Sequence, residues 1–144
     1  MYAYQIKGFM KSAARANAKI KGSVTNKRKA YIKQIDTEIF VFPDASKKAG
    51  REIVIHTDQP IVTCQRPLRA STPQGDRVAL ACSECIRAGA FLEFDILMRD
   101  SDDWDMVKEW LDYGVYNGLG QWRNSGKGAF TWHEMATAGT TIFK

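Results

Sequence analysis

The segment from Tyr113 to Phe130 constrains the fold of this chain more than any other. It reads YGVYNGLGQWRNSGKGAF and contains five glycines, Gly114, Gly118, Gly120, Gly126 and Gly128. Glycine loses more backbone entropy on folding than other residues, so such a density requires a reason. Two reasons fit: positive φ angles, or close approach of the backbone to another backbone or to a ligand. The alternative, a helix cap at Gly118 or Gly120 followed by a tight turn into a strand, explains only one or two of the glycines.

Hydrogen-bond donors and one indole stand between these glycines. Such side chains suit phosphates and unpaired bases, which predicts a nucleic-acid site in this loop. Trp122 would stack on a base, or alternatively fill a gap between a helix and a sheet. The expected site residues here are Gly120, Trp122, Arg123, Asn124, Gly126 and Lys127.

Charge is distributed unevenly along the chain. Residues 1–51 carry 12 Lys and Arg against 3 Asp and Glu, whereas the remaining 93 carry 9 against 13. No acidic residue lies between Lys7 and Lys33. A basic half of this kind indicates a surface for a polyanion, and the alternative is a solvated basic helix and loop. The residues expected to supply the salt-dependent attraction are Lys19, Lys21, Lys27, Arg28 and Lys29.

Three arginines flank a proline-containing segment from Arg66 to Gly75, which is expected to be a loop. Because guanidinium groups match phosphate geometry, Arg66 and Arg69 are further candidates for binding the nucleic-acid backbone. The alternative is that these arginines, with Arg77, only fasten a long loop.

The composition is that of one globular domain. The 144 residues are 44% hydrophobic and 26% charged, without an apolar run long enough to cross a membrane and without the apolar core of a signal peptide. We therefore expect a cytoplasmic protein. Its three cysteines, Cys64, Cys82 and Cys85, are expected to be reduced thiols. A zinc site built from them with His56 or His133 is the alternative, and no metal or cofactor is predicted.

Local patterns predict the order of elements. Four acidic residues, Asp100, Asp102, Asp103 and Asp105, stand where they favour a helix N-terminus, and a divalent-ion site is the alternative. That helix is expected over 103–116, burying Trp104, Val107, Leu111 and Val115. The other expected helix covers 9–20. Strands are expected over 2–8, 30–42, 52–56, 60–64, 77–81, 91–98 and 128–135, and the last nine residues are expected to be a tail or an edge strand.

This order matches the split βαβ plan of a ferredoxin-like α+β domain. The stretch from Arg87 to Leu97 (RAGAFLEFDIL), the helix through Leu111 and the segment from Gly118 to Phe130 (GLGQWRNSGKGAF) resemble the C-terminal half of RAMP proteins, the repeat-associated RNA-binding subunits of CRISPR effector complexes. The N-terminal half resembles that family in element order only. The segments RPLRA, RVALA and GLGQWRNSGKG also resemble small proteins of phages and prophages.

The RAMP resemblance implies one ferredoxin-like domain over residues 1–144, with an antiparallel sheet, two helices and a glycine-rich loop that guides single-stranded RNA. Gly118, Gly120, Gly126, Gly128 and Arg123 match the family motif. The expected function is non-catalytic binding of single-stranded RNA or DNA by a phage-encoded protein in the bacterial cytoplasm. Self-association or contact with a CRISPR effector complex follows by analogy.

Two other functions remain open. One is a protein-interaction module, such as a phage inhibitor that imitates or caps a CRISPR subunit. The other is a metal-independent RNA endonuclease that uses His56 or His133, although the family motif places neither histidine. An enzyme is not expected.

Overall fold

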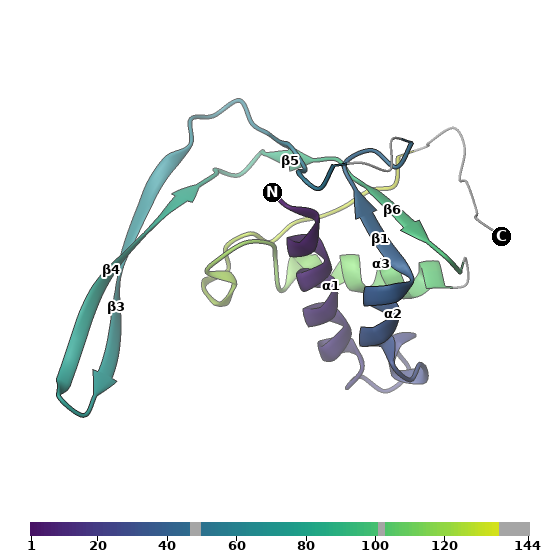
Figure 1. Ribbon diagram of the computed structural model, residues 1–144, viewed down its shortest axis with the longest axis horizontal. Coiled ribbons are helices and arrows are strands. Elements are labelled where there is room, and N and C mark those ends of the chain that lie inside the picture. The colour runs from purple at the N-terminus through teal and green to yellow at the C-terminus, as the bar shows by residue number, and fades with distance from the viewer. Residues whose placement is uncertain (47–49, 101–102, 136–144) are drawn as a thin grey trace. The chain divides into compact units, whose positions relative to one another are not determined.

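The structure is a computed structural model that describes residues 1–46, 50–100 and 103–135. The chain divides into two compact units, Met1–Ile53 with Glu93–Lys144, and Val54–Leu92. Helices and antiparallel strand pairs are both present, which confirms the α+β class (Figure 1). We call the two parts the helical unit and the hairpin unit. Whether they behave as one domain stays a prediction.

Helix α1 (Ala3–Asn17) is the central helix of the helical unit. Its buried residues include Ile6, Phe9, Met10 and Ala13, whose spacing places them along one helix face. At the N-terminus the backbone N–H of Tyr2 donates to Gln5 Oε1 at 2.8 Å, which satisfies one of the amides that a helix start leaves free. The expectation of a strand over 2–8 is wrong, because Ile6 belongs to the helical stripe.

Two further helices pack against α1. Helix α2 (Tyr31–Thr37) contacts α1 and leads into β1 (Ile39–Phe42), which pairs antiparallel with β6 (Asp95–Met98). Helix α3 (Trp104–Asp112) also contacts α1 and continues into a short 3₁₀ turn, η3 (Tyr113–Val115). The core gathers side chains from α1, α2, β1 and α3, together with Ile53: Ile6, Phe9, Met10, Ile35, Ile39, Val41, Ile53, Met106, Val107, Trp110 and Leu111.

The expected second helix is confirmed in its position, with two corrections to its buried face. Val107 and Leu111 are buried as predicted, and Trp110 is fully buried as well, whereas Trp104 is only half-buried. Val115 is 54% exposed, because the chain tightens into η3 before it and so rotates it off the buried face. Ser101 and Asp102 lie outside the described residues.

The hairpin unit consists of two antiparallel pairs. Strand β2 (Ile55–His56) pairs with β5 (Phe91–Leu92), and β3 (Val62–Thr72) pairs with β4 (Gly75–Cys85). A two-residue loop joins β3 to β4, with Gly75 at φ +110° directly after it. The expectation of a loop over 66–75 is therefore wrong: the segment is mostly strand, and Pro67 is accommodated within β3.

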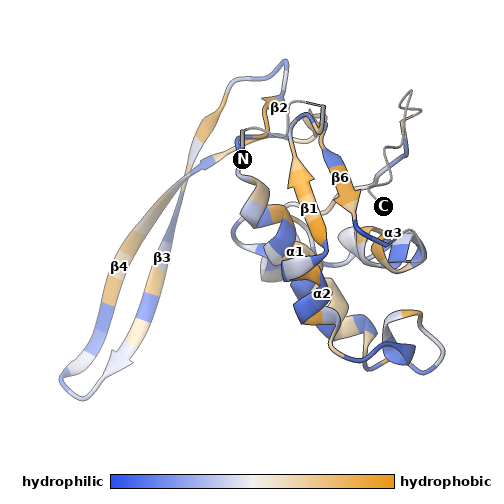
Figure 2. Cartoon of the chain, turned by 45° about the vertical axis from the view of Figure 1, so that its right-hand side comes forward, coloured by the Kyte–Doolittle hydropathy of each residue, from blue (hydrophilic) through white to orange (hydrophobic). Residues whose placement is uncertain are grey.

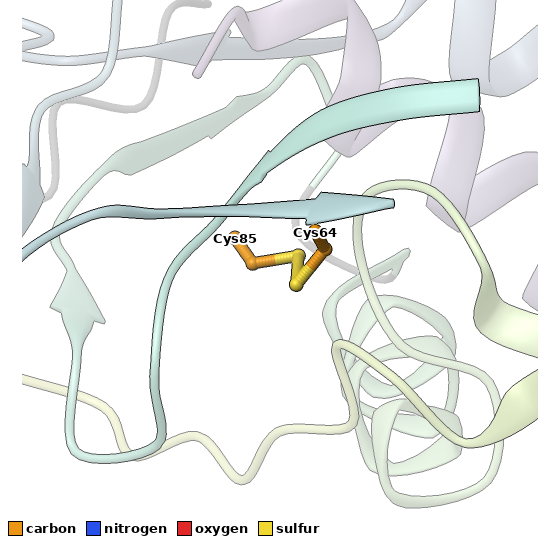
Figure 3. Close-up of a disulfide and its surroundings, with 2 residues drawn as sticks. All are labelled: Cys64 and Cys85. Carbon is orange, nitrogen blue, oxygen red and sulfur yellow. A yellow bond between two sulfur atoms is a disulfide. The ribbon is translucent and has the colours of Figure 1, made fainter. Parts of the chain in front are cut away.

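A disulfide joins Cys64 to Cys85 across this hairpin (Figure 3). Their Cα atoms lie 5.9 Å apart, and the register places both residues on the same face of the ribbon. The prediction of reduced thiols is thus wrong for these two cysteines and correct for Cys82, which is free and exposed. The sequence spacing could not show this, since only the register brings the pair together.

The strand pairs do not assemble into the sheet that the sequence suggested. Across residues 1–46, 50–100 and 103–135, the strands form three separate two-stranded sheets, and no ferredoxin-like split βαβ arrangement is shown. The segment expected as one strand over 91–98 is divided between β5 and β6, and 30–42 is divided between α2 and β1. Residues 128–135 are not a strand. The last nine residues lie outside the described part.

Within the described part of the chain, no helix is both long enough and apolar enough to cross a membrane.

Candidate nucleic-acid interface

The basic segment forms a loop that an acidic side chain of α3 holds in place. We call residues 18–30, between α1 and α2, the cationic loop. Glu109 of α3 accepts hydrogen bonds from the backbone amides of Val24 and Thr25, each at 3.0 Å, and from Thr25 Oγ1 at 2.5 Å. Thr25 is fully buried and also accepts a hydrogen bond from Trp110 Nε1 at 2.8 Å. Its polar groups are therefore satisfied on the inner side of the loop.

Other hydrogen bonds fix the two arms of the loop. Asn26 Nδ2 donates to the carbonyl of Ala18 at 2.6 Å, and Ser23 Oγ donates to the carbonyl of Asn17 at 2.8 Å. Asn17 is itself buried and donates to the backbone carbonyl of Glu109 at 3.2 Å. The loop is thus tied to α3 at both its start and its middle.

Arg28 differs from the other basic residues of this loop. Its guanidinium lies 3.3 Å from a carboxylate oxygen of Asp103, whose side chain is only 1% exposed. A buried carboxylate requires a counter-charge, so Arg28 has a structural partner. Contact of Arg28 with a polyanion stays a prediction.

The remaining basic residues of the cationic loop are exposed: Lys19, Lys21, Lys27 and Lys29. Two basic residues earlier in the run are engaged by α2. Lys11 forms a 2.6 Å ion pair with Asp36, and Lys7 donates to the Asp36 carbonyl at 3.3 Å. Burial lowers the pKa of Lys7, while the hydrogen bond from Lys11 lowers the pKa of Asp36. Arg15 on α1 and Lys33 on α2 are exposed as well, so the cationic loop carries four of the six exposed basic residues of the run.

Three of the five glycines are required by close packing within the chain. Leu119 N donates to the carbonyl of Gly128 at 2.8 Å, and a Cβ at either Gly118 or Gly128 would overlap the opposite backbone. A Cβ at Gly114 would overlap the ring of Phe130, which packs edge-on against Phe9 of α1. The glycines therefore close this loop onto itself and onto α1. The capping alternative is wrong for these positions.

The tip of the loop presents the predicted binding residues. Gly120 and Gly126 have φ angles of +84° and +77° and open space around them. Trp122 also adopts a positive φ, and the Lys127 ammonium lies 4.6 Å from its ring centroid, a cation–π contact. Arg123 begins the 3₁₀ turn η4 (Arg123–Ser125) and is half-buried. The side chain of Asn124 lies outside the described part.

The two arginines predicted on a loop are on strand β3 instead. Arg66 and Arg69 are both exposed, and the register places them on opposite faces of the ribbon, since Arg66 pairs with Ala81 and Arg69 with Val78. Arg77 shares the face of Arg66 and donates to Gln74 Oε1 at 2.8 Å. The register therefore does not bring Arg66 and Arg69 together on one face.

The structure separates the predicted site residues into three groups. The glycine-rich loop is tied to the middle of α1 by the Phe9–Phe130 contact and a 3.0 Å hydrogen bond from Asn117 to Ser12. The cationic loop follows the C-terminal end of α1 (Figure 1). The arginines of β3 belong to the hairpin unit. The glycine-rich and cationic loops are thus two places on one unit and not one pocket.

The residues considered for catalysis or metal binding are also dispersed. His56 stacks on Phe91 with ring centroids 4.8 Å apart, and His133 is exposed in the helical unit. Because Cys64 and Cys85 form the disulfide, the zinc alternative loses two of its thiolates. Within the described ranges, no group of three or more metal-ligating side chains is found.

Comparison of the chain with protein-family models, with curated proteins and with solved structures gives no match. The geometry of the site is therefore the main basis for a functional proposal. The structure adds Thr25, Glu109 and Trp110 to the candidate site, and none of the three was predicted from the sequence. A buried Thr between lysines carries no local signal, because its partner is more than 80 residues away in the chain.

Proposed function

We propose that this protein binds single-stranded nucleic acid, RNA before DNA, through the cationic loop and without catalysis. The proposal is based mainly on one observation, namely that the acidic and basic groups lie on different sides of that loop. The acidic groups that contact it, Glu109 and Asp103, lie on its inner side, while four lysines are exposed. Such a loop presents a preformed cluster of cations, so little ordering entropy opposes binding of a phosphate chain.

The glycine-rich loop supports the single-strand preference. Trp122 is only partly buried and carries Lys127 over its ring, which places an aromatic face and a cation together. Proteins that bind single strands combine these two features, because an unpaired base stacks on the ring while the cation attracts phosphate. The choice of RNA follows the RAMP resemblance of this loop and does not depend on a ferredoxin-like sheet.

The proposal is tested by fluorescence anisotropy with labelled single-stranded RNA, single-stranded DNA and duplex at several salt concentrations. We expect salt-dependent binding with a preference for single strands. The charge-reversal variant is Lys27→Glu with Lys29→Glu, which spares the Arg28–Asp103 ion pair. Losing two phosphate contacts should reduce the slope of log K against log salt by about 1.4.

A matched control variant changes the net charge of the protein by the same amount, but at residues outside the cationic loop. Arg87→Glu with Arg99→Glu alters two exposed residues outside the cationic loop. We expect this variant to retain the wild-type slope. Equal weakening by both variants would show that only net charge matters, and an absence of binding at low salt would exclude nucleic acid as the ligand.

A second candidate is the protein-interaction module, which the exposed apolar side chains of the hairpin unit favour. Under that function, the chain would bind no polyanion and would co-elute with a purified CRISPR effector subunit. The anisotropy titration separates the two functions directly.

A further inference from the structure

The hairpin unit has no buried residue of its own. All of residues 54–92 are described, and every one is exposed or half-buried. An isolated two-stranded hairpin is marginally stable in water, because it cannot bury an apolar face. Among the described residues, seven of the thirteen exposed large hydrophobic side chains belong to this unit: Val54, Ile61, Leu68, Val78, Leu80, Ile86 and Phe91. The unit therefore lacks the burial that a stable sheet requires.

The exposed apolar side chains of β4 gather on one face. The register places Val78, Leu80, Cys82 and, from β3, Pro67 on the same side, opposite to the Cys64–Cys85 disulfide. Val78 and Leu80 are 65% and 61% exposed. Figure 2 shows strongly hydrophobic segments along this ribbon. The same face also carries Arg69 opposite Val78 and Gln65 opposite Cys82, so its apolar part is the exposed cluster of Val78, Leu80 and Pro67.

The two edges of the ribbon differ in their capacity to accept another strand. Thr72 and Gly75 flank a two-residue loop, so the N–H of each residue donates to the carbonyl of the other. Every second residue pair along the ribbon from there is hydrogen-bonded in the same way. The amide and carbonyl groups of the intervening residues point outward. On β3 these residues include Pro67, which has no N–H and interrupts that edge. On β4 they are Asp76, Val78, Leu80, Cys82 and Glu84, a complete set of donors and acceptors.

We propose that β4 pairs antiparallel with β4 of a second copy of this chain, which joins two hairpins into one four-stranded sheet. In a two-fold pairing centred on Ala79, Val78 lies opposite Leu80 of the second copy, and the reverse pair repeats this contact. Both residues are on the apolar face and both have outward amides, so each pair gains backbone hydrogen bonds and apolar contact together. Four strands also meet the usual minimum for a stable sheet.

Charge and apolarity select this register over its neighbours. A two-fold pairing centred on Leu80 would place Asp76 directly opposite Glu84, and like charges in that position are destabilising. A pairing centred on Val78 would place Leu80 opposite Asp76. Only the Ala79-centred register combines two Val–Leu pairs with no like charges directly opposite. The self-complementarity of β4 thus favours a second copy over an unrelated strand.

The first test measures the mass of the full-length, nuclease-treated protein by sedimentation at increasing concentration. We expect a monomer–dimer equilibrium. Leu80→Pro removes an outward N–H from β4 and should weaken the dimer at least about tenfold, or ~1.4 kcal/mol. Gln65→Pro removes an outward N–H from the β3 edge, where Pro67 is already tolerated, and should change the affinity little.

The second test reads the register without depending on the stability of a proline variant. In the proposed pairing, Asp76 lies directly opposite Cys82 of the second copy. Asp76→Cys should therefore give a disulfide-linked dimer under mild oxidation. Glu84→Cys, on the same face of the same strand, should not link to Cys82 of the second copy. All variants keep Cys64 and Cys85.

The outcomes decide the proposal independently of nucleic-acid binding. Concentration-dependent dimers and the Asp76→Cys cross-link support it, even where no RNA is bound. A protein that stays monomeric at high concentration overturns it, as does a dimer that both proline variants leave intact. Equal cross-linking of Asp76→Cys and Glu84→Cys would overturn the register.

Discussion

Glu109 illustrates how one side chain determines the conformation of a loop that carries several charges. Its carboxylate accepts from two amides and one hydroxyl of the cationic loop, and the neighbouring Trp110 donates to the same threonine. Removing an acceptor from a buried hydrogen-bond network leaves donors unsatisfied, which costs more than the bond itself contributes. The presentation of the four lysines therefore depends on a residue that need not touch the ligand.

We expect Glu109→Ala to lower the free energy of unfolding by about 2–4 kcal/mol, because the buried amide and hydroxyl of Thr25 lose their partner. Urea unfolding at neutral pH measures this change. Glu109→Gln retains one acceptor oxygen and should cost less. If both variants were as stable as the wild type, the hydrogen bonds of Glu109 would not hold the loop.

At the scale of elements, the β3–β4 hairpin depends on a covalent link more than on packing. The Cys64–Cys85 disulfide closes a loop across the ribbon, while no residue of either strand is buried. Cross-linking of this kind stabilises mainly by restricting the unfolded chain, by about 3 kcal/mol for a loop of this size. Helix α3 is the opposite case, since its buried face fixes it without a cross-link.

We expect Cys64→Ser with Cys85→Ser to increase amide hydrogen exchange throughout β3 and β4, because the hairpin loses its only covalent restraint. Hydrogen–deuterium exchange of the intact protein measures the effect, with protection of α1 and α3 as the internal reference. Cys82→Ser is the matched control and should leave exchange unchanged, since Cys82 is free. Unchanged protection of β4 in the double variant would contradict this expectation.

At the scale of the whole molecule, the hydrophobic core belongs to the helical unit alone. Every hydrophobic residue that is buried in the described ranges, from Ala3 to Leu111, lies in Met1–Ile53 or after Glu93. The hairpin unit contributes an exposed surface instead. This division suggests that folding and assembly are carried by different parts of the chain.

We expect the helical unit to fold when Val54–Leu92 is replaced by a short Gly/Ser linker. The unfolding midpoint should stay within about 5 °C of wild type, as a change of at most ~1 kcal/mol implies. Circular dichroism with thermal unfolding checks this. The shortened chain should keep the polyanion binding of the cationic loop and lose the proposed dimer. Non-cooperative unfolding would show that the hairpin unit supports the core.

Elements whose signals lie within a few neighbouring residues could be predicted, whereas contacts between distant residues could not. Helix α3 and part of β4 were predicted because their signals, apolar spacing and branched residues, are local. The glycine-rich segment was predicted to require close backbone approach, and Gly118 and Gly128 confirm it. Pro67 misled the prediction of β3, because a proline is tolerated where its nitrogen points away from the partner strand.

Three properties of this protein could be predicted from its sequence: the α+β class, the concentration of basic residues in the first 51 positions and the requirement for glycine between residues 113 and 130. Each of these follows from residue type and short-range geometry. Three contacts could not be predicted in this way: the Cys64–Cys85 disulfide, the ion pair of Arg28 with Asp103 and the hydrogen bonds by which Glu109 anchors the cationic loop. These partners are separated by 21 to more than 80 residues, so strand register and helix packing, which no local pattern encodes, bring them together.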